Sequence, residues 1–328
     1  MGMDYRSLDD LSKAILKNRH KVPQDVDLIV GIPRSGVFAG NLLGLSLNVP
    51  VTDLDGYLKN TELVLTNPDV HQAVTHPREA RHILLVDDTI HSGRSMDHAR
   101  ELLMSTHGNQ KITSCAVFAN PKPKSVSRVN IYFETLPSPA VLEWNVLHRD
   151  KLEQFCVDID GVLCRNPTRH EDDDGTEYRK FLRYVTPLVI PTYKVGYLVT
   201  GRLEKYRNET EEWLKRHNVT YHELIMLDLP DKATRNKRNA APRFKANVYK
   251  SLKHSHLFIE SEMKEARVIS KLSGKAVLCF SNQKFLTPRF SRALVALKTK
   301  DLTSWLVKKG SRAIAKLAIS KSRDYSKV

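Results

Sequence analysis

The 328-residue sequence has few cysteines and no long apolar run. None of its four cysteines lies in C-x-x-C spacing, which argues against a zinc site or a disulfide framework and suits free thiols in a reducing compartment. No apolar run approaches the ~18 residues of a membrane-spanning helix. The first residues, MGMDYRSLDDLSK, lack the apolar core of a secretory signal. We therefore expect a protein that stays in the cytoplasm.

Acidic residues are also scarce relative to basic ones. The chain has 52 Lys and Arg against 37 Asp and Glu, a net charge of +15. Residues 281–328 hold 12 basic and 2 acidic residues, so +10 of the +15 lies there. Such an excess predicts an anionic partner: a phosphate-rich substrate, a nucleic acid or an acidic membrane surface. The hydrophobic content of 41% supports folded cores, and the length favours two domains.

Apolar runs alternate with amphipathic stretches, which predicts an α/β fold with parallel sheets. In a first domain we expect strands at 27–32, 82–88, 112–119 and 129–136, and helices at 6–18, 37–47 and 95–105. The pattern restarts with strands at 154–163, 194–202, 256–262 and 276–281, and helices at 205–217 and 265–274. The expected domains are residues 1–150 and 151–283, followed by a basic, helical tail at 284–328.

Two adjacent carboxylates, Asp87 and Asp88, end the predicted strand 82–88 within the stretch ILLVDDTIHSGRS. Ligands of open parallel sheets bind at the carboxyl ends of the strands. A carboxylate pair suits the two hydroxyls of a ribose. The turn Ser92-Gly93-Arg94-Ser95 precedes a helix N-terminus and suits a phosphate. The pattern therefore fits a ribose 5-phosphate pocket, although an ordinary strand–turn–helix with solvated acids also accounts for it.

The stretch VDDTIHSGRS resembles the loop of type I phosphoribosyltransferases that binds phosphoribosyl diphosphate (PRPP), and GIPRSG (31–36) resembles the pyrophosphate loop of that family. The resemblance covers about residues 20–145. It implies Mg²⁺ bound with the diphosphate and attack by an acceptor on C1 of the ribose. The implied PRPP-binding residues are Arg34, Ser35, Gly36, Asp87, Asp88, Ser92, Gly93, Arg94 and Ser95.

Two further features follow from this resemblance. The polar segment 55–80 is expected to be a mobile hood over the site, with Lys59, Arg78 and Arg81 either approaching PRPP or forming a solvated face. His91 stands where purine-specific members often carry an aspartate. A histidine can take a proton from an attacking sugar hydroxyl near neutral pH, so His91 is a candidate base; a loop histidine that only forms hydrogen bonds is the alternative.

The segment CVDIDGVLC (156–164) places a second pair of carboxylates at a strand end. Asp158 and Asp160 would face the same side of the strand, one as nucleophile and the other as acid and base. This D-x-D-G-V pattern resembles motif one of haloacid dehalogenase (HAD) phosphatases. The same resemblance implies that Thr200 in LVTGR binds a phosphoryl oxygen and that Lys245 in FKANVYK, in preference to Lys250, is the motif-three lysine.

FIESE (258–262) stands where the acidic metal motif of that family is expected, with Glu260 and Glu262 replacing the usual aspartates. The expected Mg²⁺ ligands are therefore Asp158, Asp160, Glu260 and Glu262. The segment between the first two motifs is short, about 35 residues, which predicts a small cap, a HAD-like Rossmannoid domain and an open site that admits a bulky substrate.

The tail at 302–319 forms a basic amphipathic pattern with Trp305 among its apolar residues. Such a helix can lie on an anionic bilayer, or it can pack on the body of the protein with its lysines in water. No recognisable nucleic-acid-binding module accompanies the charge, which disfavours a nucleic-acid partner.

A phosphoribosyl transferase joined to a phosphatase would install an unphosphorylated ribofuranosyl group. The chain resembles bifunctional enzymes that make ribofuranose residues of bacterial surface polysaccharides, which implies PRPP as donor and a lipid-linked glycan as acceptor. A nucleobase phosphoribosyltransferase with nucleotide phosphatase activity is an alternative. A PRPP-sensing regulator that binds nucleic acid is another, although the intact acidic motifs argue against a purely regulatory role.

Overall fold

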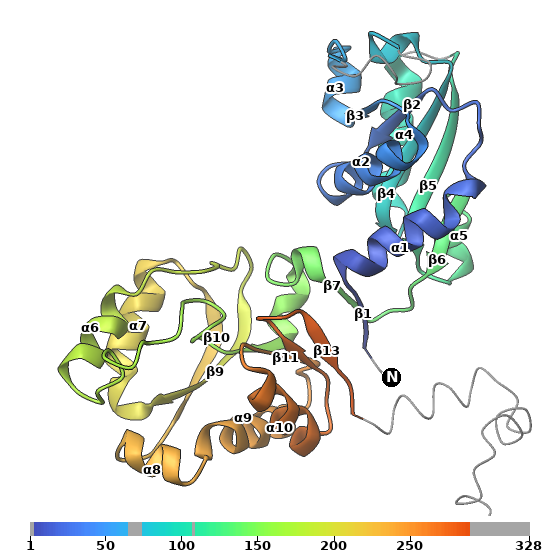
Figure 1. Cartoon of the computed structure of the whole chain (residues 1–328). Coiled ribbons are helices and arrows are strands. Elements are labelled where there is room, and N and C mark those ends of the chain that lie inside the picture. Colours follow the sequence, from blue (N-terminus) through green and yellow to red (C-terminus); the bar gives the residue numbers. More distant parts are fainter. Residues whose placement is uncertain (1–2, 65–73, 107–108, 289–328) are drawn as a thin grey trace, which may run out of the picture. The chain divides into compact units, whose positions relative to one another are not determined.

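The computed structural model describes residues 3–64, 74–106 and 109–288. The chain divides into two compact units, Met3–Leu152 and a second unit that begins at Glu153 (Figure 1). Most of the predicted tail at 284–328, including its amphipathic stretch, lies outside the described residues.

The first unit is built on a five-stranded parallel sheet with the order β3-β2-β4-β5-β6. Its strands are β2 (Leu28–Gly31), β3 (Val51–Asp53), β4 (His82–Ile90), β5 (Lys111–Ala119) and β6 (Ile131–Thr135). A separate parallel pair joins β1 (Asp4–Arg6) and β7 (Ala140–Leu142). The helices are α1 (Leu8–Asn18), α2 (Ser35–Leu47), α3 (Leu54–Lys59), α4 (Arg94–Thr106) and α5 (Pro123–Val126). The prediction of an α/β fold with a parallel sheet is confirmed for this unit.

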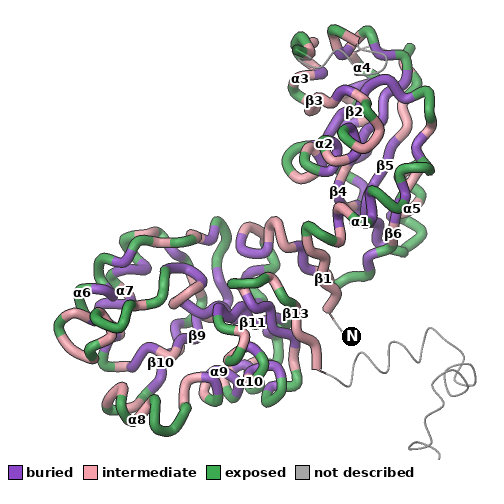
Figure 2. Tube along the Cα trace, viewed as in Figure 1, coloured by how far each residue is buried: buried purple, intermediate pink, exposed green. Residues whose placement is uncertain are grey.

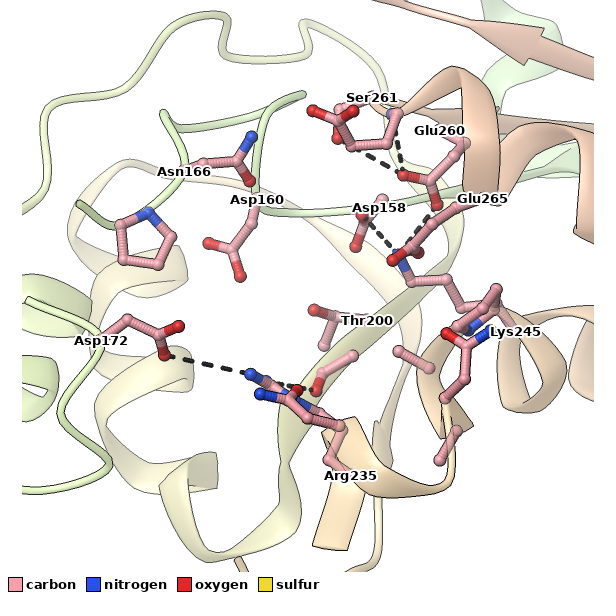
Figure 3. Close-up of a pocket in the computed structure, with 18 of the residues that line it drawn as sticks. Asp158, Asp160, Asn166, Asp172, Thr200, Arg235, Lys245, Glu260, Ser261 and Glu265 are labelled. Atoms are coloured by element: carbon pink, nitrogen blue, oxygen red, sulfur yellow. Dashed lines mark hydrogen bonds and ion pairs between the residues drawn. The ribbon is translucent and has the colours of Figure 1, made fainter. Parts of the chain in front are cut away.

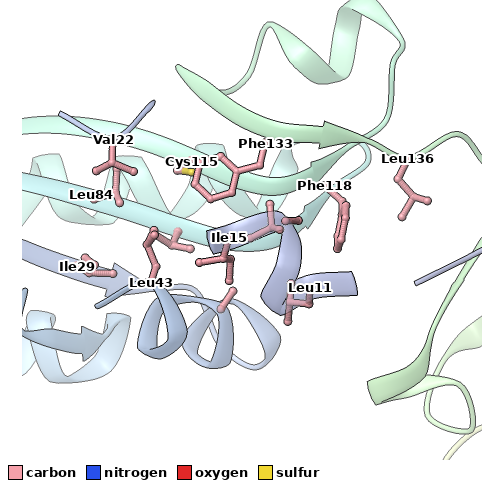
Figure 4. Packing of buried hydrophobic residues seen from close by; sticks show 14 of the residues in the cluster. Leu11, Ile15, Val22, Ile29, Leu43, Leu84, Cys115, Phe118, Phe133 and Leu136 are labelled. Carbon is pink, nitrogen blue, oxygen red and sulfur yellow. The ribbon is translucent and has the colours of Figure 1, made fainter. Parts of the chain in front are cut away.

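Apolar side chains cover both faces of this sheet. On one face, Leu11 and Ile15 of α1 and Leu43 of α2 pack with Leu84 and Phe118 of the sheet (Figure 4). The other face packs against α4 and α3. A Cβ on Gly44 would lie 2.2 Å from Cγ2 of Val51. Glycine at this position therefore lets the last turns of α2 lie directly on the sheet beside β3.

Two sequence-based boundaries in this unit are wrong. The segment expected as a loop at 55–80 begins with α3, whose N-terminus is capped by the Asp53 carboxylate accepting from Gly56 N at 2.7 Å; residues 65–73 lie outside the described part. The strand expected to end at Asp88 continues to Ile90, because Thr89 and Ile90 still pair with Phe118 and Ala119 of β5.

The second unit is an α/β unit with a six-stranded mixed sheet in the order β10-β9-β8-β11-β12-β13. Its strands are β8 (Phe155–Val157), β9 (Val195–Leu203), β10 (Tyr221–Leu227), β11 (Leu257–Glu260), β12 (Val277–Cys279) and β13 (Lys284–Leu286); only β13 runs antiparallel to its neighbour. The helices are α6 (Thr176–Tyr184), α7 (Arg207–Arg216), α8 (Lys232–Lys237), α9 (Ala240–Ser251) and α10 (Met263–Ser273). Figure 2 shows that the central strands of both sheets are mostly buried.

The strand expected at 154–163 is much shorter in the structure. β8 ends at Val157, and the chain then folds into a tight turn in which Gly161 has φ = 77° and Val162 N donates to Ile159 O. The predicted glycine end of the helix at 265–274 is confirmed, since Gly274 is the left-handed C-cap of α10. Within the described residues, no helix is both long and apolar enough to cross a membrane.

Candidate functional sites

In the first unit, the turns after β2 and β4 lie against each other at the carboxyl ends of neighbouring strands. Gly31 pairs with Val86 in the sheet. A Cβ on Gly36 would lie 2.7 Å from the carbonyl oxygen of Val86 and 3.1 Å from Oδ1 of Asp87. Only glycine allows this approach, which brings the Arg34–Gly36 turn beside the first carboxylate.

The two adjacent carboxylates have different surroundings. Asp88 is 4% exposed, and its Oδ2 accepts a hydrogen bond of 2.8 Å from the indole Nε1 of Trp144. Asp87 is partly exposed, and its Oδ1 accepts from Asp88 N at 2.9 Å. Burial, and then the charge of Asp88, raise the pKa of Asp87 well above its usual range. The ionised form of Asp87 is therefore disfavoured in the free protein, and a ligand that donates hydrogen bonds to the carboxylates would stabilise it.

The turn before α4 leaves polar groups open at a helix start. Gly93 has φ = 81°, and a Cβ there would lie 2.6 Å from Cγ of Arg128. Glycine is therefore required both by the backbone and by its neighbour. Ser92, Arg94 and Ser95 are exposed around this turn. Open hydroxyls, a cation and a helix N-terminus are suited to hold an anion.

His91 lies in the same turn but is already hydrogen-bonded. Its Nε2 is 3.0 Å from Oγ of Ser138, which in turn accepts from Asn120 Nδ2 at 2.8 Å. The carbonyl oxygen of His91 accepts from Ser125 Oγ. The ring is exposed. These contacts orient the imidazole and are compatible with either role expected for it.

A cavity of about 370 Å³ adjoins the Arg34 turn. Its lining is mostly apolar and aromatic: Leu8, Arg34, Ser35, Phe38, Trp144, Asn145 and His148. The buried Oδ1 of Asn145 has no hydrogen-bond partner among the described residues. Arg34 and Ser35 of the first predicted PRPP-binding turn line this cavity, and Trp144, which also lines it, donates to Asp88.

The three basic residues expected to act with the hood, Lys59, Arg78 and Arg81, have different surroundings in the structure. Lys59 pairs with Asp55 at 2.7 Å, and Arg78 Nη2 donates to Leu58 O at 2.7 Å. Arg81 directly precedes β4, at the opposite end of the strand from Asp87 and Asp88. Arg81 therefore does not lie over the predicted PRPP site.

In the second unit, predicted site residues converge on a cavity of about 400 Å³ (Figure 3). Asp158 and Asp160 follow β8, Thr200 lies near the end of β9, Glu260 ends β11, and Lys245 comes from α9. β9, β8 and β11 are parallel neighbours. Segments far apart in the sequence thus meet at one edge of the sheet, as expected for ligand-binding ends of parallel strands.

Lys245 is the centre of this cluster. Its Nζ lies 2.8 Å from Asp158 Oδ2, 2.8 Å from Glu260 Oε2 and 2.9 Å from Glu265 Oε2. Burial opposes the charge of the ammonium group, but the three carboxylates outweigh it and raise the pKa of Lys245 well above its usual range. Lys250, the other lysine of the predicted motif, is exposed. The ammonium group of Lys245 therefore stays protonated, and its ion pair holds the Asp158 side chain in position.

Asp160 is held by an arginine that the sequence analysis missed. The side chain of Arg202 is fully buried, and its Nε and Nη2 donate to Oδ2 and Oδ1 of Asp160 at 3.1 and 2.7 Å. Its Nη1 also donates to Thr210 Oγ1 at 3.3 Å. A two-pronged contact of this kind fixes both the position and the rotation of a carboxylate.

Glu265 was also missed. The spacing Glu260-Ser261-x-x-x-Glu265 carries the signal: Glu260 ends β11, and Glu265 lies in the first turn of α10, where both reach Lys245. Glu262, which was expected as a metal ligand, lines the cavity but is exposed at the N-cap of α10. No group of three or more His, Cys, Asp or Glu side chains in the described ranges is arranged to hold a metal ion.

Three consecutive aspartates hold the loop that covers one side of the cavity. Asp172 pairs with Lys232 at 2.8 Å, Asp173 accepts from the first backbone N–H groups of α6, and Asp174 accepts from Lys205 and Tyr206. The acidic loop therefore ties α6, the β9–α7 turn and α8 together. Part of the segment expected as a small cap thereby lines the cavity.

Comparisons with known proteins match the first unit. Residues 4–149 match the family model described as a phosphoribosyl transferase domain. Similar solved structures include a purine phosphoribosyltransferase from Pyrococcus horikoshii Ot3 (19% identity, 44% of this chain and 94% of that chain, TM-score 0.33) and a Helicobacter pylori xanthine-guanine-hypoxanthine phosphoribosyltransferase (17%, 44%, 93%, 0.33). No curated protein matches the chain. Residues 4–149, less than half of the chain, are thus similar to a phosphoribosyl transferase domain.

Proposed function

We propose that the chain transfers a 5-phosphoribosyl group from PRPP to an acceptor hydroxyl and then hydrolyses the 5-phosphate, leaving a ribofuranosyl residue. The family match at residues 4–149 supports the transfer. The hydrolysis rests on one observation: Asp158, Asp160, Thr200 and Lys245 line a single cavity, with Lys245 Nζ 2.8 Å from Asp158.

In the transfer, Asp87 and Asp88 would accept from the ribose hydroxyls, the Ser92–Ser95 turn would hold the 5-phosphate, and the Arg34–Gly36 turn would hold the diphosphate. The acceptor oxygen forms a bond to C1 as the bond from C1 to the diphosphate breaks. The proton of the acceptor hydroxyl passes to His91, whose ring is oriented by Ser138. Displacement in line inverts C1, so an α-diphosphate gives a β-riboside.

In the hydrolysis, a carboxylate oxygen of Asp158 would attack phosphorus, and Asp160 would donate a proton to the leaving oxygen. Asp160 then takes a proton from the water that cleaves the aspartyl phosphate. The Thr200 hydroxyl donates to a phosphoryl oxygen, and Lys245 neutralises developing charge. Arg202 keeps the Asp160 carboxyl aimed at one place through both steps.

The described residues hold no preformed cluster of metal ligands, but the charge of this cavity favours an incoming Mg²⁺. Six carboxylates line it (Asp158, Asp160, Asp172, Glu260, Glu262 and Glu265), against two cations, Arg235 and Lys245. A phosphate dianion entering such a cavity is repelled unless a further cation is present. Carboxylate oxygens are the ligands that Mg²⁺ prefers, and Asp158, Asp160, Glu260 and Glu262 are the proposed set. The ion would supply charge neutralisation at the phosphoryl oxygens.

We also propose that the acceptor is a lipid-linked glycan and that the basic tail brings the protein to the anionic membrane surface. The +10 charge of residues 281–328 supports this. Sedimentation with anionic vesicles at low salt tests the tail: a chain truncated near residue 300 should bind less than the full chain.

The decisive experiment incubates the full chain with PRPP, Mg²⁺ and candidate acceptors, followed by mass analysis. A gain of one ribosyl phosphate, followed by loss of phosphate, is the expected result on a glycan. The same gain on a nucleobase, and none on a glycan, would replace the proposed acceptor. No gain on any acceptor would overturn the transferase assignment.

A further inference from the structure

Three exposed asparagines give the second cavity an amide-rich wall. Asn166 follows the β8 turn, Asn236 lies in α8 and Asn239 follows α8. Within the described residues, the side chains of Asn166 and Asn239 make no hydrogen bond, and the only one of Asn236 is a 3.4 Å contact with Arg235 Nε. The donors and acceptors of these three amides are therefore available to a ligand in the cavity.

Arg235 adds a cation to this wall. Its side chain is 18% exposed, and its Nη1 donates to the carbonyl oxygen of Gly201 at 3.2 Å, one residue from Thr200. Its Nη2 is 3.9 Å from Asp172, whose short ion pair is made with Lys232 instead. Figure 3 places Arg235 between Asp172 and Thr200. The guanidinium is therefore fixed beside the proposed phosphoryl site without being saturated.

The chemistry of this wall selects one class of leaving group. Amide and guanidinium groups match hydroxyl and ring oxygens, which both donate and accept. Among the described residues that line the cavity, Tyr178 is the only aromatic one. It is 4% exposed and packs edge-on against Tyr206 at 4.9 Å, so it offers no free face for stacking a base.

We propose that Asn166, Arg235, Asn236 and Asn239 form a subsite for the leaving group of a phosphorylated carbohydrate. The inference rests on the proposed phosphatase activity and specifies its substrate class. The subsite contacts hydroxyl and ring oxygens of the sugar while the scissile phosphate lies against Asp158 and Thr200. A nucleoside monophosphate gains nothing from its base here.

The test uses the full chain with Mg²⁺ and three probes: methyl β-ribofuranoside 5-phosphate, adenosine 5′-monophosphate and p-nitrophenyl phosphate. Arg235→Leu and Asn236→Ala are compared with Lys237→Gln, an exposed neighbour on α8 that is not among the residues lining the cavity. Loss of one or two hydrogen bonds to the sugar should lower kcat/KM for the riboside phosphate about tenfold. In these two variants kcat/KM for p-nitrophenyl phosphate should stay within about twofold of the wild type. In Lys237→Gln, kcat/KM for all three probes should stay within the same range.

The outcomes separate the two proposals. Hydrolysis of none of the probes by the wild type would overturn the phosphatase itself. If the wild type is active, unchanged kcat/KM for the riboside phosphate in both Arg235→Leu and Asn236→Ala would overturn the subsite. Preference of the wild type for adenosine 5′-monophosphate over the riboside phosphate would overturn the carbohydrate class. Arg235 also donates to the carbonyl oxygen of Gly201, so an equal loss of kcat/KM on all probes in Arg235→Leu would indicate a structural role for Arg235. In that case the result for Asn236→Ala alone decides whether the subsite exists.

Discussion

The indole Nε1 of Trp144 donates a 2.8 Å hydrogen bond to Oδ2 of Asp88, across 56 residues of sequence. Asp88 is buried and charged, so this donor offsets part of the cost of desolvating it. The contact also fixes which carboxylate oxygen remains for a ribose hydroxyl. Trp144 is therefore a positioning residue for the proposed PRPP site.

Trp144→Phe should raise the KM for PRPP about tenfold and change kcat little, because a hydrogen bond to a charged group is worth about 1.5–3 kcal/mol. Initial rates at varied PRPP measure this. Phe38→Leu is the matched control, since Phe38 lines the same cavity but has no hydrogen-bonding group to offer to Asp88. An equal rise in both variants would mean that the cavity shape matters and the Asp88 contact does not.

Removing both carboxylates, in Asp87→Ala with Asp88→Ala, should abolish transfer from PRPP. The ribose then has no acceptor for its hydroxyls, and loss of positioning can add several kcal/mol to a barrier. The variant should still hydrolyse p-nitrophenyl phosphate, which reports the other unit. Normal transfer by the folded double variant would refute the ribose-binding role.

Asp158→Asn should stop hydrolysis and spare transfer. The amide cannot act as a nucleophile toward phosphorus, whereas the residues proposed for transfer lie in the first unit. Mass analysis after incubation with PRPP and an acceptor should show a 5-phosphoribosylated product that accumulates. Release of the dephosphorylated product at the normal rate would show that the phosphatase assignment is wrong.

The different roles of Glu262 and Glu265 in the second cavity can be tested by comparing their glutamine variants. Glu265→Gln removes a carboxylate 2.9 Å from the buried Lys245, so phosphatase kcat should fall about tenfold or more. Glu262→Gln changes an exposed side chain at the same cavity. As loss of a proposed Mg²⁺ ligand, it should mainly raise the Mg²⁺ concentration needed for half-maximal activity. A loss of kcat in Glu262→Gln but not in Glu265→Gln would show that Glu262, and not Glu265, supports the catalytic step.

Each apolar run expected as a strand contains one in the structure, because such runs are long enough to mark a buried element. The short strand β3, the strand β10 and the helices α6, α8 and α9 were not predicted. It predicts the convergence of Asp158, Thr200 and Lys245 only through resemblance to known motifs. Arg202 and Glu265 were missed because their partners lie far away in sequence: Asp160 is 42 residues before Arg202, and Lys245 is 20 before Glu265. The extent of β4 depends on pairing with β5, which no local pattern records. α3 was missed because its stretch is short and contains Gly56.

A final prediction concerns the stability of the first unit. Burial and the neighbouring charge of Asp88 raise the folded-state pKa of Asp87 well above its value in the unfolded chain. The folded state therefore binds more protons than the unfolded state between those two pKa values, so Asp87 lowers stability progressively as the pH rises from about 4 through its raised pKa. Asp87→Asn removes this cost.

The Asn variant should consequently melt a few degrees above the wild type at pH 7, and the difference should shrink toward zero below about pH 3, where the wild-type carboxyl is protonated in both states. Thermal unfolding followed by tryptophan fluorescence at several pH values measures this. Glu62→Gln, a change at an exposed carboxylate of the same unit, is the control and should show no such trend. A melting difference that does not depend on pH would contradict the ionisation account and point to altered hydrogen bonding around the Asp88 backbone.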